Sequence, residues 1–448
     1  MTERPEGVLP DEVIRDPKSD AELLFVTLRP DLERPALEGF LRGLSQAVAG
    51  LTGGEGADRA ASACVGLGKR FLDRAEAVPV GLTQLPAVTQ GELLDVDLVI
   101  YVMCREEWRL ADFRRGLASL GAGVVTSVLV QRGFQRPDGR ELGGFLDGLR
   151  NARDDRDAVV FVDRDRDPSE PAAAEGGTYM VTMRIPQDLA AWAALTEAEQ
   201  EQVMGRRKSD GSRLDVPAGT AVDAEGELTA GCPLASHVAK AGPRGEHRDR
   251  VKIFRRGVPF IELRPDGILD AGLQFVSFQA SMEQFLTLSD EWMSNTDFPE
   301  PGTGVDALFA RGFATVTHTG FFFVPAPAEF IGAQFLAGQP VEDRCLGRIA
   351  VRKKLVDSSG SPIRGERGGF GFQLLDQAGS PIGEPFMTDS TGRALSPAAP
   401  VGDTYTVREV TTRSGFDPAP DQAVALDRRR IQIEVINKAT VPNPGYGR

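Results

Sequence analysis

The chain has 448 residues but only four cysteines, three histidines, three tryptophans and four tyrosines. Its cysteines, Cys64, Cys104, Cys232 and Cys345, form no C-x-x-C pair, which argues against a zinc site and against a disulfide framework. A few scattered cysteines fit a reducing compartment. The three histidines are the only imidazoles from which the chain can draw a metal ligand.

Basic residues and long apolar runs are also scarce. Lys and Arg number 51 against 65 Asp and Glu, a net charge of −14, which argues against nucleic acid or an anionic membrane as the main partner. No apolar run approaches the roughly 20 residues that a membrane span needs. The first twenty residues contain no apolar signal region and no twin arginine. We therefore expect a cytoplasmic protein, and an extracellular one only if a leader is missing.

A hydrophobic fraction of 41% is enough for a substantial core, and the length suits two or three domains. A Pro- and Ala-rich stretch after about residue 325 separates two regions with different patterns. We predict five segments: a tail over residues 1–20, a main domain over 21–330, a linker over 331–346, a second domain over 347–438 and a tail over 439–448.

The main domain alternates strand and helix patterns. Strands are expected at 23–28, 98–103, 124–131, 178–185, 251–254 and 273–278, and helices near 35–48, near 108–120, from Pro186 and from Met282. Thr196 and Glu199 predict a capping box. Strand–helix–strand, repeated, is typical of a ferredoxin-like unit. We predict an α+β fold of two ferredoxin-like halves with antiparallel sheets, resembling a dimeric α+β barrel, with a ligand site between the halves.

Three polar residues in the main domain stand in suggestive contexts. Asp147 lies in a G-x-x-D-G motif that begins at Gly144, His237 lies in A-S-H-V, and Arg255 lies in I-F-R-R-G. Each motif is weak alone, because Asp between glycines is usually a turn residue. The other histidines have plainer interpretations: His247 lies in a charged turn, and His318 lies in a strand that precedes three phenylalanines.

Longer motifs around these residues resemble dye-decolourising (DyP-type) haem peroxidases over roughly residues 20–330. They are F-x-D-G-x-x-N from Phe145 to Asn151, A-W-x-A-L from Ala191, G-R-x-K from Gly205, and R-x-x-x-P-F from Arg255 to Phe260. The resemblance is B-type-like. One position departs from it, because B-type members carry Asn two residues beyond the arginine and this chain carries Gly257.

The resemblance implies haem b (iron protoporphyrin IX), with His237 as the ligand that holds iron from one side. Asp147 and Arg255 would act on hydrogen peroxide at the other face. A carboxylate can carry a proton from one peroxide oxygen to the other, and a guanidinium can stabilise charge on the departing oxygen. Small aromatic reductants, phenolic or dye-like, would supply the electrons.

The same resemblance assigns five further residues to cofactor binding. Arg206 would anchor a haem propionate, and Asp306 would accept a hydrogen bond from the ligand histidine. Asn151, Phe260 and Phe275 complete the set, the phenylalanines as pocket walls. Plainer readings stay open, since an arginine at a helix end is commonly solvated and phenylalanines commonly pack in cores.

The second domain shows period-2 strands at 349–355, 370–374, 405–407 and 431–435, which predict a small β-sandwich. It resembles the Cna-B-like (prealbumin-like) domains of bacterial surface proteins. That resemblance implies an isopeptide bond from Lys353 to Asn437, assisted by Glu409. Lys354 is a rival, but Lys353 shares a strand face with Ile349, Val351 and Leu355. The alternative is three unconnected polar residues at strand ends.

Three functions compete. The first is a haem peroxidase, the second a haem-binding or iron-release (deferrochelatase-like) protein with incidental peroxidase activity, and the third a surface or assembly module. The sequence leaves open a homo-oligomer and a compartment shell or surface partner for the C-terminal domain.

Overall fold

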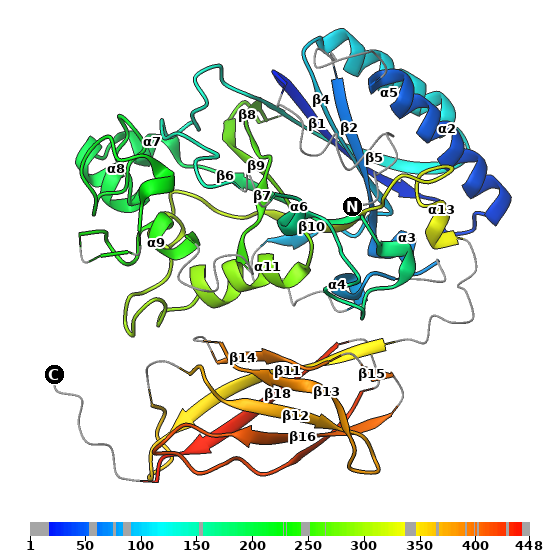
Figure 1. Cartoon of the computed structure of the whole chain (residues 1–448). Coiled ribbons are helices and arrows are strands. Elements are labelled where there is room, and N and C mark those ends of the chain that lie inside the picture. Colours follow the sequence, from blue (N-terminus) through cyan, green and yellow to red (C-terminus); the bar gives the residue numbers. More distant parts are fainter. Residues whose placement is uncertain are drawn as a thin grey trace. The chain divides into compact units, whose positions relative to one another are not determined.

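The computed structural model describes residues 18–440, apart from 53–60, 75–77, 84–90, 152–155, 227, 230, 243–250, 265, 337–345, 364–366, 390–391, 398, 401–402 and 427–429. The chain divides into two compact units (Figure 1). Unit 1 comprises Met1–Asp163 and Ala173–Gly338, and unit 2 comprises Arg164–Ala172 and Gln339–Arg448. Most of the predicted tails and linker, and His247, lie outside the described residues.

Unit 1 is built on one ten-stranded sheet with the order β5-β1-β4-β2-β10-β6-β9-β7, to which β3 and β8 are added beside β10 and β9. Its strands are β1 (Asp20–Leu28), β2 (Ala61–Gly68), β3 (Glu92–Leu93), β4 (Leu98–Cys104), β5 (Val125–Phe134), β6 (Thr178–Pro186), β7 (Phe254–Arg255), β8 (Val258–Leu263), β9 (Leu269–Gln279) and β10 (His318–Val324). Except for the parallel pair β3–β10, neighbouring strands are antiparallel.

Helices cover this sheet and fill its long connections. They are α2 (Arg34–Thr52), α3 (Lys69–Leu72), α4 (Val80–Thr83), α5 (Glu107–Leu120), α6 (Arg156–Val160), α7 (Leu189–Ala193), α8 (Glu197–Met204), α9 (His237–Ala241), α11 (Met282–Leu286), α12 (Ala307–Ala310) and α13 (Ala333–Leu336), with the π-helix η4 (Thr287–Met293) and the short 3₁₀ turns Ala172–Ala174 and Val222–Ala224. Figure 1 shows α2 and α5 side by side on one face of β1, β2, β4 and β5.

The topology confirms two ferredoxin-like halves. The first half runs β1-α2-β2-β4-α5-β5 and the second uses β6 to β10, and the two join edge to edge where β2 pairs with β10. The sheet curls toward a barrel, so that β5 approaches β8: a Cβ on Gly133 would lie 2.4 Å from Val258 Cγ2. A glycine at this position therefore permits the close approach.

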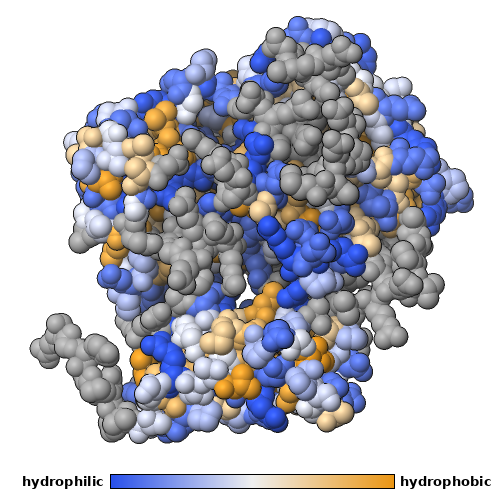
Figure 2. Space-filling model, viewed as in Figure 1, coloured by the Kyte–Doolittle hydropathy of each residue, from blue (hydrophilic) through white to orange (hydrophobic). Residues whose placement is uncertain are grey.

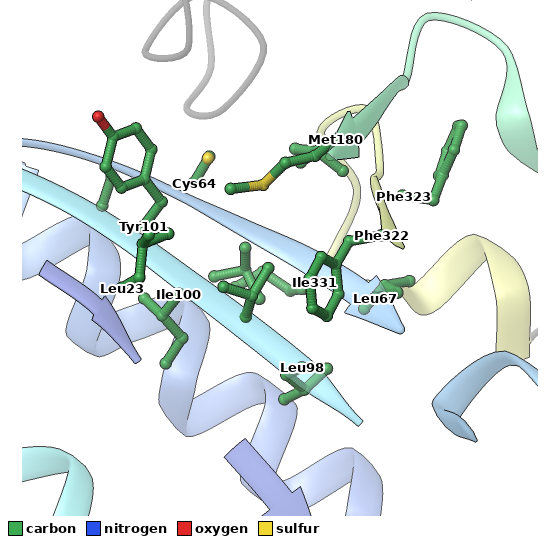
Figure 3. Packing of buried hydrophobic residues seen from close by; sticks show 14 of the residues in the cluster. Leu23, Cys64, Leu67, Leu98, Ile100, Tyr101, Met180, Phe322, Phe323 and Ile331 are labelled. Atoms are coloured by element: carbon green, nitrogen blue, oxygen red, sulfur yellow. The ribbon is translucent and has the colours of Figure 1, made fainter. Parts of the chain in front are cut away.

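The core of unit 1 forms where apolar strands are buried on both faces. Every residue of β2 and of β4 is buried. Figure 3 shows Phe322 of β10 beside Leu67, Leu98 and Ile331. The short, small-residue strand β2 was not among the predicted elements, because alanine, cysteine and glycine carry little strand signal.

One predicted helix start is wrong. Pro186 does not open a helix but ends β6, and Asp188 caps α7 by accepting a hydrogen bond from the Ala191 N–H. The predicted capping box is present, with Thr196 and Glu199 bonding each other's backbone N–H groups at the start of α8.

Unit 2 contains two four-stranded sheets. One has the order β14-β11-β15 with β18 beside β11, and the other β13-β12-β16-β17. The strands are β11 (Leu346–Val356), β12 (Gly371–Leu375), β13 (Pro381–Met387), β14 (Arg393–Leu395), β15 (Ala399–Pro400), β16 (Thr404–Thr411), β17 (Gln422–Ala425) and β18 (Arg430–Lys438). Apolar residues of both sheets share one core, which confirms the small sandwich.

The surface carries mostly polar side chains. In the face drawn in Figure 2, the apolar residues that are coloured form small separate groups among hydrophilic ones. Within the described part of the chain, no helix has the length and apolar character that a membrane crossing requires.

Candidate active site

A mostly apolar cavity of about 270 Å³ lies within unit 1. Its walls come from the Glu141–Arg150 loop, β6, the segments around α7–α9, β7, β9, α11, η4 and α12. Apolar side chains that include Phe275, Leu288 and Phe313 form most of the lining, whereas Asp147, His237 and Arg255 add polar groups. An apolar pocket with a few convergent polar groups is the usual form of a ligand site.

His237 is held by Asp306. The ring Nδ1 lies 2.7 Å from Asp306 Oδ2, and the side chain of Asp306 is 2% exposed. Asp306 is itself fixed, because its Oδ1 caps α12 by accepting the Leu308 N–H, and its own N–H donates to the Met293 carbonyl. Burial works against protonation of His237, but the charge and hydrogen bond of Asp306 outweigh it and raise the pKa of the ring. With Nδ1 engaged, Nε2 is the nitrogen left for a ligand.

Asp147 and Arg255 meet in the same cavity. Arg255 Nη2 lies 3.4 Å from Asp147 Oδ1, a long contact between side chains that are 32% and 37% exposed. Asn151 does not line the cavity: its amide accepts from the Arg255 N–H and donates to the Arg255 carbonyl, both at 2.9 Å. Its amide thus holds the backbone of Arg255, and the assignment of Asn151 to cofactor binding stays a prediction.

The packing of β9 explains why this chain carries Gly257 where the B-type pattern has asparagine. A Cβ there would lie 2.9 Å from the Gln274 carbonyl oxygen and 3.3 Å from the Phe275 Cα. The close approach of β9 therefore leaves no room for an asparagine side chain.

Glu141 lines the cavity too, and the sequence analysis missed it. Burial, and then the negative charge of Asp147, raise the pKa of Glu141 to about 8, whereas Arg255 and Arg136 act in the opposite direction. The sequence did contain an indication of this position. Glu141, Phe145 and Asp147 are spaced across a short turn so that they lie on one face of a hairpin.

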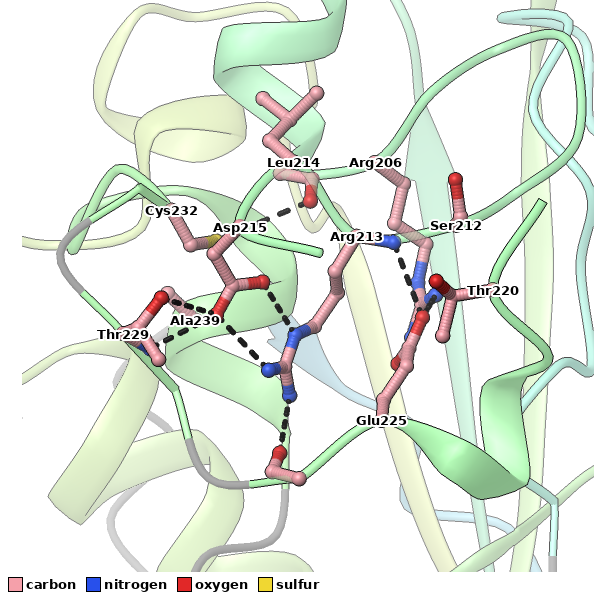
Figure 4. A network of polar contacts seen from close by, with 12 residues as sticks. Arg206, Ser212, Arg213, Leu214, Asp215, Thr220, Glu225, Thr229, Cys232 and Ala239 are labelled. Carbon is pink, nitrogen blue, oxygen red and sulfur yellow. Dashed lines mark hydrogen bonds and ion pairs between the residues drawn. The ribbon is translucent and has the colours of Figure 1, made fainter. Parts of the chain in front are cut away.

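Arg206 lines the cavity, but its guanidinium already forms an ion pair with Glu225. Its guanidinium forms two bonds to Glu225, at 2.7 and 3.0 Å, and a third to the Gly211 carbonyl at 2.6 Å. Figure 4 shows this pair beside the Arg213–Asp215 pair. Arg150 also lines the cavity, with Nη1 3.6 Å from Glu225, and was not predicted. The role of Arg206 as a propionate anchor stays a prediction.

The two predicted wall residues differ. Phe275 lines the cavity, but Phe260 does not: it is fully buried on β8, with the Arg184 guanidinium 3.8 Å from its ring centroid. Phe260 thus supports the Arg184 side chain, and its assignment as a pocket wall stays a prediction. His318 also lies elsewhere, on β10 with Nδ1 3.1 Å from Thr317 Oγ1.

Comparisons with known proteins agree with this geometry. A family model described as "Dyp-type peroxidase, C-terminal" matches residues 138–329. The structure resembles a crystal structure of a DyP-type peroxidase from Streptomyces coelicolor, with a TM-score of 0.61, 26% identity, and coverage of 72% of this chain and 94% of that one. Residues 138–329 thus match the DyP-type peroxidase family model, and unit 1 resembles DyP-type peroxidase structures.

The curated relatives that this chain resembles carry two descriptions. A dye-decolorizing peroxidase of Thermobifida fusca is 31% identical over 240 residues, which cover 48% of this chain and 55% of that protein. A deferrochelatase of Escherichia coli is 34% identical over 157 residues, 32% of this chain and 36% of that protein. The chain thus spans about half the length, or less, of these curated relatives.

The residues of the cavity fit haem. Apolar walls suit a porphyrin, and His237 presents one free ring nitrogen, with its other nitrogen held by a carboxylate. In the described part of the chain, no three His, Cys, Asp or Glu side chains cluster as a bare metal site. A single imidazole matches an iron whose other ligands come from a macrocycle.

Unit 2 contains a second polar cluster. Lys353 Nζ donates to Glu409 Oε2 at 2.8 Å, and Asn437 Nδ2 donates to Glu409 Oε1 at 2.8 Å. The Lys353 and Glu409 side chains are 0% and 1% exposed. Burial lowers the pKa of Lys353, although Glu409 opposes this. Lys354 instead forms an exposed pair with Glu434, so Lys353, and not its rival, shares the partner Glu409 with Asn437.

Proposed function

We propose that the chain is a haem-dependent peroxidase that oxidises phenolic or dye-like donors with hydrogen peroxide. One observation carries the proposal: His237, backed by Asp306, and the Asp147–Arg255 pair line the same apolar cavity. Haem b, when bound, would supply the iron and the redox chemistry. The match of residues 138–329 to the DyP-type peroxidase family model, and the likeness of unit 1 to DyP-type peroxidase structures, support this assignment.

Each residue has a distinct task in this proposal. His237 Nε2 would hold the iron, and Asp306 fixes the tautomer by accepting a hydrogen bond from Nδ1–H and raises the basicity of the ligand. Asp147 takes a proton from one peroxide oxygen and returns it to the other. Arg255 stabilises negative charge on the departing oxygen, and a guanidinium cannot lose its own proton there.

A visible spectrum tests the proposal. The purified chain, supplied with haem, should show a Soret band whose position or height changes when hydrogen peroxide is added. The original band should return when a phenolic donor is added. A protein that binds no haem, or whose spectrum ignores peroxide, contradicts it.

Iron release is the second candidate, and the similarity to a deferrochelatase over 157 residues is what favours it. The two functions differ in product. Iron release leaves metal-free porphyrin, which fluoresces, whereas peroxidase turnover leaves haem intact and consumes the donor. Fluorescence that grows with time without peroxide would favour iron release.

For unit 2 we propose an intramolecular isopeptide bond from Lys353 to Asn437. An uncharged Lys353 amine attacks the Asn437 amide carbon, a C–N bond forms, and ammonia leaves with a proton carried by Glu409. Glu409 touches both partners, and the fully buried Lys353 Nζ lies 4.5 Å from the ring centroid of Phe370. Asn437 Oδ1 is buried with no hydrogen-bond partner among the described residues.

A further inference from the structure

Glu141 and Asp147 lie on opposite sides of a short hairpin that faces the cavity. Arg140 pairs with Leu146 in an antiparallel bridge, and the Glu141 N–H donates to the Phe145 carbonyl at 2.9 Å. Directly opposed residues project to the same face, and so do residues two apart. Glu141, Phe145 and Asp147 therefore share one face, and all three line the cavity. Diagonal neighbours of this kind are about 7–8 Å apart, which two carboxyl side chains can span.

The two carboxyl groups occupy different surroundings. Glu141 Oε2 is buried and has no hydrogen-bond partner among the described residues. Asp147 is 37% exposed and contacts Arg255. A buried carboxyl group without a partner favours its neutral form, and a negative neighbour strengthens that preference. Burial is the larger cause of the raised pKa of Glu141, and the negative charge of Asp147 is the second.

The nearby cations are directed elsewhere. Arg136 is bound by both carboxylate oxygens of Asp138, and Lys208 donates to Gln200 Oε1. Arg140 donates to the carbonyls of Gly144 and Lys208. Arg255 turns toward Asp147, so the described residues give Glu141 no ion pair.

We propose that Glu141 and Asp147 form a carboxyl pair that retains one proton at neutral pH, with Glu141 as the proton holder and Asp147 as the member that faces peroxide. This role rests on the proposed peroxidase function, although the pair itself does not. Glu141 keeps its proton during the step, which leaves Asp147 as the member that takes a proton from one peroxide oxygen, beside Arg255. The O–H bond of the peroxide breaks as an O–H bond forms on Asp147. That bond breaks in turn when Asp147 returns the proton to the departing oxygen, so the pair ends with the single proton it began with. Glu141 thus acts through Asp147 as a positioning residue, because it decides which carboxyl group accepts the proton of peroxide.

Infrared spectroscopy of the full chain without haem tests the pair. At pH 7 the wild type should show the C=O band of a neutral carboxylic acid, and the difference spectrum of wild type minus Glu141→Gln should contain the part due to Glu141. Glu197→Gln, which changes an exposed carboxylate in the first turn of α8, is the matched control and should give no such difference band. Asp147→Asn should keep the Glu141 band but move its titration midpoint to lower pH, because a negative neighbour is gone. A difference spectrum without this band, or an unmoved midpoint in Asp147→Asn, overturns the proposal.

Stability against pH is the second measurement. Between the ordinary value of 4.5 and about 8, Glu141 is neutral when folded and ionised when unfolded. The unfolded chain thus binds fewer protons, and stability must fall as pH rises through this window. Glu141→Gln should flatten that fall in the melting temperature of the haem-free chain, and an unchanged slope contradicts the pair. If these results hold while peroxide leaves the haem-loaded spectrum unchanged, the peroxidase proposal fails and the pair stands.

Discussion

At the scale of single residues, the chemistry of the cavity depends on how each polar side chain is held. His237 is oriented by Asp306, which is fixed in turn by α12 and by the Met293 carbonyl. Arg255 is oriented through its backbone by Asn151. Such supporting hydrogen bonds set the geometry of a ligand or an electrostatic donor more narrowly than its own rotamers do.

Removing the proposed iron ligand gives the first prediction. His237→Ala should abolish stable haem binding, because the cavity has no other described imidazole to replace it. His318→Ala, on β10 and outside the cavity lining, is the control and should retain haem. Haem content and the Soret spectrum after desalting measure both. Normal ligation in His237→Ala would refute the role.

The second prediction concerns the peroxide face. Asp147→Ala should slow the reaction with peroxide by ~10²–10⁴-fold through loss of an acid–base group. Arg255→Leu should slow it by ~10²–10³-fold through loss of an electrostatic donor. Arg256→Leu is a neighbouring control, since its guanidinium stacks 4.8 Å from the Phe254 ring centroid. Stopped-flow absorbance measures the rates, and both active-site variants should still bind haem. Wild-type rates in both would contradict the assignment.

At the scale of elements, the structure ties sequence-distant segments together at both polar clusters. The Glu141–Asp147 hairpin, β7 and α9 meet at the cavity, and β11, β16 and β18 meet at Glu409. The alternation of side chains along β11 explains how Lys353 reaches Glu409. Alternate residues of β11 point inward, so Lys353 enters the core with Ile349 and Val351, while Arg352 and Lys354 stay outside.

The strand cross-link gives the third prediction. If Lys353 joins Asn437, the intact mass should lie about 17 Da below the sequence mass, because ammonia leaves in this covalent modification. Lys353→Met should restore the mass expected from its sequence, and Lys354→Met should not. Glu409→Ala should lose the bond and melt lower, since a link between distant strands stabilises by roughly 2–4 kcal/mol as a disulfide does. A wild-type mass equal to the sequence mass contradicts the bond.

At the scale of the whole molecule, two units with separate cores predict separate responses. A ligand that binds only the folded form of one unit stabilises that unit by mass action. Calorimetry of the full chain should therefore show two transitions. Haem should raise the midpoint temperature of the unit 1 transition only, because a ligand at a hundredfold excess over Kd adds about 2.7 kcal/mol to the free energy of unfolding. Glu409→Ala should lower the midpoint temperature of the unit 2 transition only. A single transition that both changes move together would contradict independent units.

Much of this architecture was predictable because hydrophobic periodicity is a local property. The long apolar strands β1, β4, β6 and β9 and the amphipathic helices α2 and α5 were expected within a few residues of their bounds. The strand β2 and the residue Pro186 were misread, since small residues carry little strand preference and proline is accepted at a strand end as well as at a helix start.

The sequence by itself determined the family motifs, the two ferredoxin-like halves, the sandwich, and Asp147, His237, Arg255 and Lys353 as the residues to examine. Only the tertiary structure decided which neighbours complete them. Glu141 emerged as a cavity residue, Asn151 as a support for Arg255, Phe260 as a support for Arg184, and Glu225 as the partner of Arg206. The physical reason is that motif and periodicity act over a few residues. Burial, ion pairing and the direction of a side chain depend on segments tens to hundreds of residues apart, which only the folded chain brings together.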